Sequence, residues 1–308
     1  SDIDIEKLIN LITSESTSNP GPIHVNVPIE KPLIITIQKR KKVLDIFDKT
    51  YLNRKINICK NKFFKEKRSF WESKFIEINL KKTGLIIVGP YRGSPNDLKE
   101  FNNSLKVIQQ ITGWPVFPDP VSGVDPSLKG IVENWELLIK NIKVSDFEQL
   151  LRLGPLPASS ILEEFLQDFT GPHFLIKEND TRNLDPLKKA IEYESGLNKF
   201  VSNLLEKNPS INTSSKSLIP IASKLKRDGE KIKTLLKNEV LKYDQITELS
   251  LAKLVPEIWP KDLPIMISAS SPIRDWLTYS GKEVLSRRCF SFRGASGIDG
   301  TLSMALGI

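Results

Sequence analysis

The sequence predicts an α/β protein built on a doubly wound parallel sheet. Continuous apolar runs such as Leu85-Ile-Ile-Val88 are typical of strands that are buried on both faces. These runs alternate along the chain with amphipathic helical patterns, as in a parallel sheet with crossover helices. Tight turns such as Gly89-Pro-Tyr-Arg-Gly93 follow the strand ends. With 308 residues, 39% of them hydrophobic, the chain is long enough for two domains and a sizeable core.

The first 33 residues predict one helix and one strand. Residues 1–18 repeat apolar side chains at helical spacing. Ile23, Val25 and Val27 then alternate with polar neighbours, which indicates a strand that flanking prolines keep short. We interpret His24 as a histidine at a domain edge in preference to a catalytic one.

Residues 34–82 form a basic connector. The whole chain has a net charge of +8, and residues 39–68 alone hold 12 Lys and Arg against 3 Asp and Glu. Two interpretations stay open. One is a solvated connector helix whose aromatic residues pack on its neighbours; the other is a nucleic-acid-binding module in which lysines and aromatic residues interleave. We favour the first, because the excess charge is confined to this segment.

Residues 83–206 carry the strand and helix alternation that predicts the sheet. The predicted strands are Leu85–Val88, Trp114–Phe117, Phe147–Leu153 and His173–Ile176, and the predicted helices are Asp97–Ile111, Val132–Ile142, Ser159–Phe169 and Leu184–Glu206. A polar loop then leads to residues 207–260, with helices predicted at about 217–242 and 245–255. Ligands of such folds bind beyond the carboxyl ends of the strands.

The last segment, residues 261–308, predicts a second strand–turn–helix region. Leu263–Ser268 reads as a strand, followed by a helix with Ser271 as its N-cap and Pro272 at its first position. A further strand is predicted at Arg288–Phe292, and a buried helix at Thr301–Ile308.

A glycine-rich turn, Arg293-Gly-Ala-Ser-Gly-Ile-Asp-Gly300, joins these last two elements. Glycines let a ligand approach the backbone closely, and a helix start attracts anions. The spacing is not that of the dinucleotide fingerprint, so a nicotinamide site is disfavoured. The pattern alone fits a cofactor turn and a packing turn equally.

Two cysteines, Cys59 and Cys289, make neither a disulfide framework nor a metal quartet, so we expect a reducing, cytoplasmic setting. No apolar run approaches the roughly 18 residues of a membrane span. The chain does not begin with Met and ends in apolar residues, and we therefore expect it to be a piece of a longer protein.

The amino-acid sequences of several segments resemble those of one family. The turn at 293–300, the phrases Leu151-Arg-Leu-Gly-Pro-Leu-Pro-Ala-Ser159 and Asn179-Asp-Thr-Arg-Asn183, and the segment Ser270-Ser-Pro-Ile-Arg274 resemble 2-succinyl-5-enolpyruvyl-6-hydroxy-3-cyclohexene-1-carboxylate synthases. These are thiamine-diphosphate-dependent enzymes of menaquinone and phylloquinone biosynthesis. Gly21-Pro-x-His-x-Asn-x-Pro28, Gly113-Trp-Pro-Val116 and Asp119-Pro-x-Ser-Gly123 add to the resemblance.

The resemblance implies how the chain is divided. Residues 1–33 would end the pyrimidine-binding domain, 34–82 would be the connector, and 83–206 the middle domain. Residues 207–260 would be a helical connection, and 261–308 would start the diphosphate-binding domain. The family's activating glutamate would precede Ser1 and its Mg²⁺ motif would follow Ile308, so we expect no metal ligand here and an inactive chain by itself.

The resemblance also implies the site. Ser270, Arg274 and Arg293 would bind substrate, and Ser296, Gly297 and Ile298 would bind thiamine diphosphate. For Ser270 and Arg274 the other interpretation is a well-capped helix with an exposed arginine. The family often carries a lysine directed at a substrate carboxylate where this chain has Ser160.

The activity implied is a transferase reaction, in which 2-oxoglutarate is decarboxylated and the product carbanion adds to isochorismate. The family binds its cofactor between subunits, which implies a homodimer or homotetramer. We expect no nucleic-acid partner. The alternatives are the basic nucleic-acid-binding module and a non-catalytic subunit of the thiamine family.

Overall fold

The computed structural model describes residue 41 and residues 77–178, 180, 182–211, 216–241, 245–292 and 300–307. The strand predicted around His24 and nearly all of the basic connector lie outside these residues, as do Arg293, Ser296, Gly297 and Ile298. From residue 77 onward the described chain belongs to one compact unit, Phe70–Ile308.

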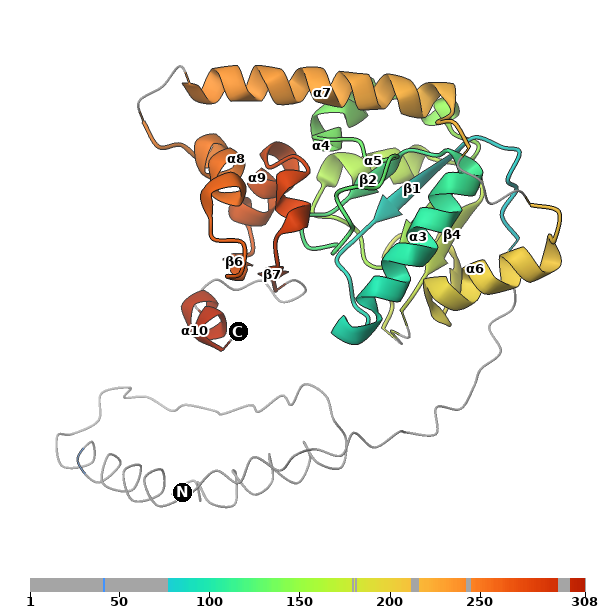
Figure 1. Cartoon of the computed structure of the whole chain (residues 1–308), viewed down its shortest axis with the longest axis horizontal. Helices are drawn as coiled ribbons and strands as arrows, with labels where there is room; N and C mark the ends of the chain where they lie inside the picture. Colours follow the sequence, from blue (N-terminus) through green and yellow to red (C-terminus); the bar gives the residue numbers. More distant parts are fainter. Residues whose placement is uncertain are drawn as a thin grey trace. The chain divides into compact units, whose positions relative to one another are not determined.

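The described strands and helices confirm the α/β class (Figure 1). The strands are β1 (Gly84–Val88), β2 (Val116–Pro118), β3 (Gln149–Leu153), β4 (His173–Ile176), β5 (Ile191–Tyr193), β6 (Ile265–Ile267) and β7 (Cys289–Ser291). The helices are α3 (Leu98–Thr112), α4 (Trp135–Leu138), α5 (Ser160–Asp168), α6 (Gly196–Lys207), α7 (Pro220–Leu241), α8 (Glu248–Ile258), α9 (Ser271–Tyr279) and α10 (Thr301–Leu306). Short 3₁₀ turns η1 (Pro95–Asp97), η2 (Ile139–Asn141), η3 (Val144–Asp146) and η4 (Glu283–Ser286) complete the order.

Five parallel strands form the main sheet in the order β2-β1-β3-β4-β5. All five residues of β1 and of β3 are buried. For β1 this confirms the burial predicted from its continuous apolar run, whereas β3 buries Gln149 and Arg152 among its apolar residues. Successive strand residues point to opposite faces of the sheet and belong to two hydrophobic cores. Ile86 and Leu151 pack with α3 and α6, whereas Ile87 and Leu150 pack with α4, α5 and α7. Helices therefore cover both faces, which confirms the doubly wound architecture.

The second sheet is small. β6 and β7 pair in parallel with Ile267 opposite Ser291. Ile265 and Ile267 of β6, together with Ile273 and Leu277 of α9, are buried in the same core as α4 and α5. Helix α7 extends from α4 to α8 (Figure 1) and so links the two regions.

The helix predicted over Leu184–Glu206 was wrong in its first half, where the structure has a loop and β5. The carboxylate of Asp185 accepts hydrogen bonds from the backbone N–H groups of Lys189 and Ala190, at 2.7 and 2.8 Å. Lys188 adopts a left-handed φ of 52° in this turn. The turn sends the chain back as an edge strand, and α6 begins only at Gly196.

Several other predicted boundaries also need correction; the strand predicted at Leu263–Ser268, for example, spans only Ile265–Ile267. Within Val132–Ile142 helix begins only at Trp135, because Asn134 is left-handed with φ 51° and the N–H of Val132 donates to Val116 of β2. The strands predicted at Trp114–Phe117 and Phe147–Leu153 begin two residues later. The N-cap of α9 is Ser270, one residue before the predicted Ser271.

Helix α10 was predicted to be buried, and this was wrong. Leu302 and Leu306 are 72% and 81% exposed, and α10 has no buried residue.

Candidate functional site

The parallel pairing of β6 with β7 directs both strand ends to the same edge. Ser270 and Arg274 follow β6, and the glycine-rich turn follows β7. Because ligands of parallel sheets bind beyond this edge, two of the predicted site segments converge there. The structure describes Ser270 and Arg274; the other four predicted residues, in the turn itself, lie outside the described part.

Ser270 has an unusual backbone. Its φ of 72° and ψ of −130° are angles that side-chain-bearing residues rarely adopt. Although Ser270 is the N-cap of α9, its hydroxyl makes no capping hydrogen bond, and the residue is exposed. Backbone strain of this kind persists where the surroundings impose it, and it concentrates at functional sites.

Arg274 lies in the first turn of α9 and is exposed. Its backbone carbonyl accepts a hydrogen bond from the hydroxyl of Thr278 at 2.8 Å. Burial and the charge of Glu248 raise the pKa of the neighbouring Asp275, while Arg274 lowers it. A guanidinium fork at a helix start suits a carboxylate, which it can bind with two parallel hydrogen bonds.

Three described residues border the turn, and the sequence analysis missed all three. Ser268 at the end of β6 lies 3.3 Å from the hydroxyl of Thr301, the first residue of α10. The Ser291 hydroxyl is buried and has no hydrogen-bond partner among the described residues. Serines and threonines beside a glycine-rich turn are too common in sequences to have singled these out.

A separate apolar groove of about 380 Å³ lies at the start of β6. It is lined by Val255, Trp259, Pro264, Ile265, Met266, Trp276 and Ala305. None of the polar residues described above lines this groove.

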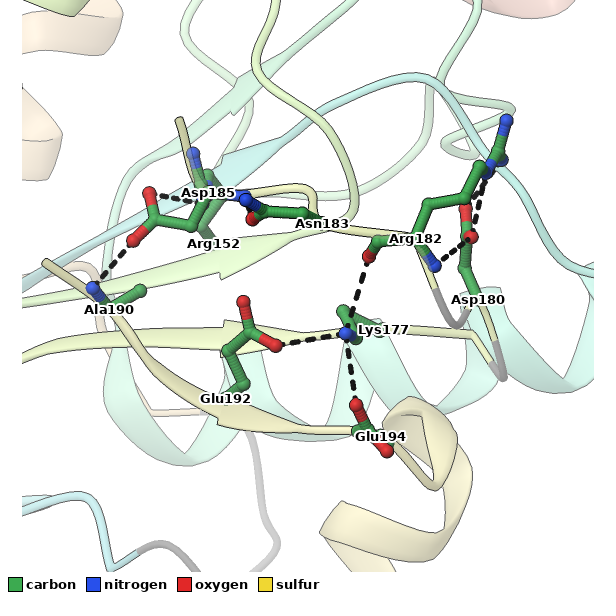
Figure 2. A network of polar contacts seen from close by, with 9 residues as sticks. All are labelled: Arg152, Lys177, Asp180, Arg182, Asn183, Asp185, Ala190, Glu192 and Glu194. Carbon is green, nitrogen blue, oxygen red and sulfur yellow. Dashed lines mark hydrogen bonds and ion pairs between the residues drawn. The ribbon is translucent and has the colours of Figure 1, made fainter. Parts of the chain in front are cut away.

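A second polar cluster lies where β4 and β5 end, and Figure 2 shows its contacts. Lys177 Nζ contacts Glu192 and Glu194 at 2.8 and 3.0 Å and donates to the carbonyl of Arg182 at 3.3 Å. Burial by itself lowers the pKa of Lys177, but its two carboxylate partners raise it above the ordinary value. The Arg182 side chain pairs with Asp180 at 2.5 Å. These ion pairs and hydrogen bonds connect the loop between β4 and β5 to the ends of the two strands.

Ser160, where the family often has a lysine, is the exposed first residue of α5. Its neighbour Ser159 caps this helix by accepting the N–H of Leu162 at 2.9 Å. Burial raises the pKa of the nearby Glu136, which hydrogen-bonds Ser159. A carboxylate thus stands close to this helix start.

Neither a metal centre nor a membrane span is found in the described ranges. No three His, Cys, Asp or Glu residues there are grouped closely enough to hold a metal ion. Of the helices described, none combines the length and apolar character needed to cross a bilayer.

Comparison with curated proteins gives close relatives along the whole chain. Proteins named 2-succinyl-5-enolpyruvyl-6-hydroxy-3-cyclohexene-1-carboxylate synthase from Prochlorococcus marinus strains MIT 9515 and AS9601 are each 52% identical, over 100% and 99% of this chain. The protein of the same name from strain NATL2A is 39% identical over 98% of the chain. In each case the match covers 52% of the relative, so the chain spans about half the length of the curated relatives it matches.

Other comparisons add little. No family model matches the chain. Among solved structures, a putative thiamin diphosphate-dependent enzyme from Mycobacterium smegmatis aligns with a TM-score of 0.38 and 13% identity, over 68% of this chain and 38% of that one. A likeness this low does not bear on function.

Proposed function

Because this chain is a relative of the 2-succinyl-5-enolpyruvyl-6-hydroxy-3-cyclohexene-1-carboxylate synthases over its whole length, we propose that it forms part of such a synthase. The complete protein that carries it decarboxylates 2-oxoglutarate with thiamine diphosphate and Mg²⁺ and joins the product to isochorismate. A cytoplasmic location and a homodimer or homotetramer are part of the same proposal. The observation that supports it is the parallel pairing of β6 with β7, since Ser270 and Arg274 follow β6 in the chain and the glycine-rich turn follows β7.

The described surroundings of the turn fit a bound polar group. A Cβ added to Gly300 would meet no atom within 4 Å, so the backbone is open to close approach there. The buried hydroxyl of Ser291, which has no hydrogen-bond partner among the described residues, precedes the same turn by one residue and suits a polar partner. We assign the cofactor contacts to Ser296, Gly297 and Ile298, and the cofactor supplies the electron sink for decarboxylation when it is bound.

The chain's own residues bind and orient the substrates. Both substrates are carboxylates, and the guanidinium groups of Arg274 and Arg293 can each hold a carboxylate with two parallel hydrogen bonds. The exposed hydroxyl of Ser270, which caps no helix N–H, donates to the same carboxylate. Placing these donors at the positive end of α9 favours an anion further.

Replacing Arg274 in the complete protein that carries this chain tests the proposal. A hydrogen bond to a charged group contributes roughly 1.5–3 kcal/mol, so Arg274→Ala should lower kcat/KM about 10- to 150-fold. Arg274→Lys should recover part of the loss, since lysine lacks the fork. Thiamine diphosphate affinity should stay unchanged. Arg227→Ala, at an exposed arginine of α7, is the matched control and should leave kcat/KM intact. Unchanged kcat/KM in Arg274→Ala with a lower Tm would make Arg274 structural and refute its role in binding.

The nucleic-acid interpretation of residues 39–68 makes a different prediction. A solvated lysine segment gives affinity through counterion release alone, so DNA or RNA binding should vanish near physiological salt. A sequence-specific complex that survives higher salt would favour the alternative module. A complete protein that binds neither cofactor nor substrate would instead favour a non-catalytic subunit.

A further inference from the structure

Helix α9 is held at both ends by unusual backbone conformations. The described part of the chain has three non-glycine residues with positive φ, namely Asn134, Lys188 and Ser270. Ser270 starts α9, and the side-chain amide of Asn134 donates a hydrogen bond of 2.8 Å to the carbonyl of Thr278 in its last turn. Two of the three strained residues therefore sit at opposite ends of one nine-residue helix.

An ion cluster fixes the Asn134 end. Lys233 Nζ of α7 lies 3.1 Å from Glu133 and 2.5 Å from Glu283 of η4. Lys282 reaches Glu133 at 3.6 Å, and the buried Lys253 of α8 reaches Glu283 at the same distance. Four separate segments are thus tied together directly beside the end of α9.

Gly281 shows how closely this cluster is packed. It follows α9 with φ 66°, and a Cβ at this position would lie 2.9 Å from a Glu283 carboxylate oxygen and 3.3 Å from one of Glu133. The chain leaving α9 therefore passes against both carboxylates. Ile273 and Leu277, which are buried, fix the inner face of the same helix.

We propose that Asn134, supported by the Glu133–Lys233–Glu283 cluster, is a positioning residue for substrate binding. It fixes the last turn of α9, and the helix acts as a rigid strut that sets the position of Ser270 and Arg274 at its other end. This role rests on the proposed function, because it assumes that Arg274 binds a substrate carboxylate. Small displacements of such a group are costly to catalysis.

The first test compares two variants of the complete protein in which an asparagine is replaced by aspartate. Asn134→Asp keeps the size of the side chain and tolerates the left-handed backbone, but it loses the N–H donor. We expect the KM for 2-oxoglutarate or isochorismate to rise about 10-fold, in line with the loss of one hydrogen bond. The matched control is Asn102→Asp on α3, which loses two amide donations, to Leu98 and Gly123, on the other face of the sheet. It should lower Tm comparably and leave KM unchanged.

A double-mutant cycle separates positioning from general destabilisation. In an Arg274→Ala background, Asn134→Asp should change kcat/KM by less than about twofold, because the group it positions is gone. Equal effects of Asn134→Asp in both backgrounds, or an unchanged KM in the single variant, would overturn the inference. If Arg274→Ala itself leaves KM unchanged, it is the proposed function that fails.

Amide hydrogen exchange tests the strut without substrate or activity. Asn134→Asp, compared with Asn102→Asp, should speed exchange of the first hydrogen-bonded amides of α9, those of Arg274 and Asp275, as well as in its last turn. Faster exchange in the last turn alone would overturn the strut.

Lys233 provides an independent variant. Lys233→Met should raise KM as Asn134→Asp does, and Lys233→Arg should restore it. Lys231→Met is the control on the same helix, since Lys231 is 75% exposed and pairs with Asp228 alone among the ion pairs described. A KM that is equal in both methionine variants would contradict a role for the cluster.

Discussion

The guanidinium of Arg152 lies 2.9 Å from the carboxylate of Asp185, and the two side chains are 0% and 3% exposed. Arg152 belongs to β3, whereas Asp185 lies in the loop that leads to β5. Although burial alone raises the pKa of Asp185, N–H donors from Ala190 and Lys189 and the charge of Arg152 hold it below 3.8. One ion pair therefore ties a central strand to the turn that places the sheet's edge strand.

Asp185→Asn should destabilise the fold strongly. It leaves the buried charge of Arg152 without a partner, which costs about 3–5 kcal/mol. Urea unfolding at pH 7 measures this loss. Asp228→Asn, which breaks the exposed pair with Lys231, should change stability by less than about 1 kcal/mol. If the free energy of unfolding fell equally in the two variants, the buried pair would contribute no more to stability than the exposed one.

His173 should make stability depend on pH. Burial and the charge of Arg152 lower its pKa from 6.5 to about 4. Between these values the unfolded chain binds a proton that the folded chain does not. The free energy of unfolding therefore falls as pH drops through this window, by up to about 3 kcal/mol.

His173→Leu should flatten that dependence between pH 6.5 and 4, whatever its effect on absolute stability. His24→Leu is the control, since the chain has only two histidines, and it should keep the wild-type slope. A slope that survives His173→Leu would assign the titration to other groups.

Ser159→Ala should cost about 1 kcal/mol, the typical contribution of a serine N-cap. The structure predicts this loss because the Ser159 hydroxyl accepts the N–H of Leu162 at 2.9 Å. Ser160→Ala, one residue further on and exposed, should leave Tm unchanged. Similar Tm values for the two variants would argue against the cap.

Replacing Gly89 by alanine should lower stability strongly, whereas replacing Gly300 should not. A Cβ on Gly89 would lie 1.6 Å from the carbonyl oxygen of Pro155, so Gly89→Ala has to push apart the ends of β1 and β3. We expect a loss of several kcal/mol or failure to fold. Gly300→Ala meets no atom within 4 Å and should unfold at the wild-type temperature. Thermal unfolding of both variants decides the matter.

The sequence was sufficient for the elements whose signal is local. The buried strand β1 was predicted because a parallel strand covered on both faces needs a continuous apolar run. Helix α5 was predicted to within a residue at each end, and in the structure Ser159 is its N-cap. The strand, turn and helix start around Ser270 and Arg274 were predicted from local patterns, whereas the binding role of these two residues came from the family resemblance.

The elements that depend on distant partners were missed. The pattern of residues 184–206 predicts a helix, but the structure has the edge strand β5 there. This strand forms because Asp185 pairs with Arg152, 33 residues away, and accepts the N–H of Lys189 in the turn that leads into the strand. The burial predicted for α10 was wrong for a similar reason. An apolar pattern shows which face of a helix could be buried, but it does not show whether another element packs against that face.

The sequence by itself thus determined the α/β class and which residues stand at the end of β6, because hydrophobic periodicity and turn chemistry act between neighbours. The tertiary structure alone decided how α9 is held. Its last turn is fixed by Asn134, 144 residues away in the chain, within an ion cluster built from four separate segments. Such contacts depend on how the chain folds back on itself, and no local pattern encodes the distance between their partners.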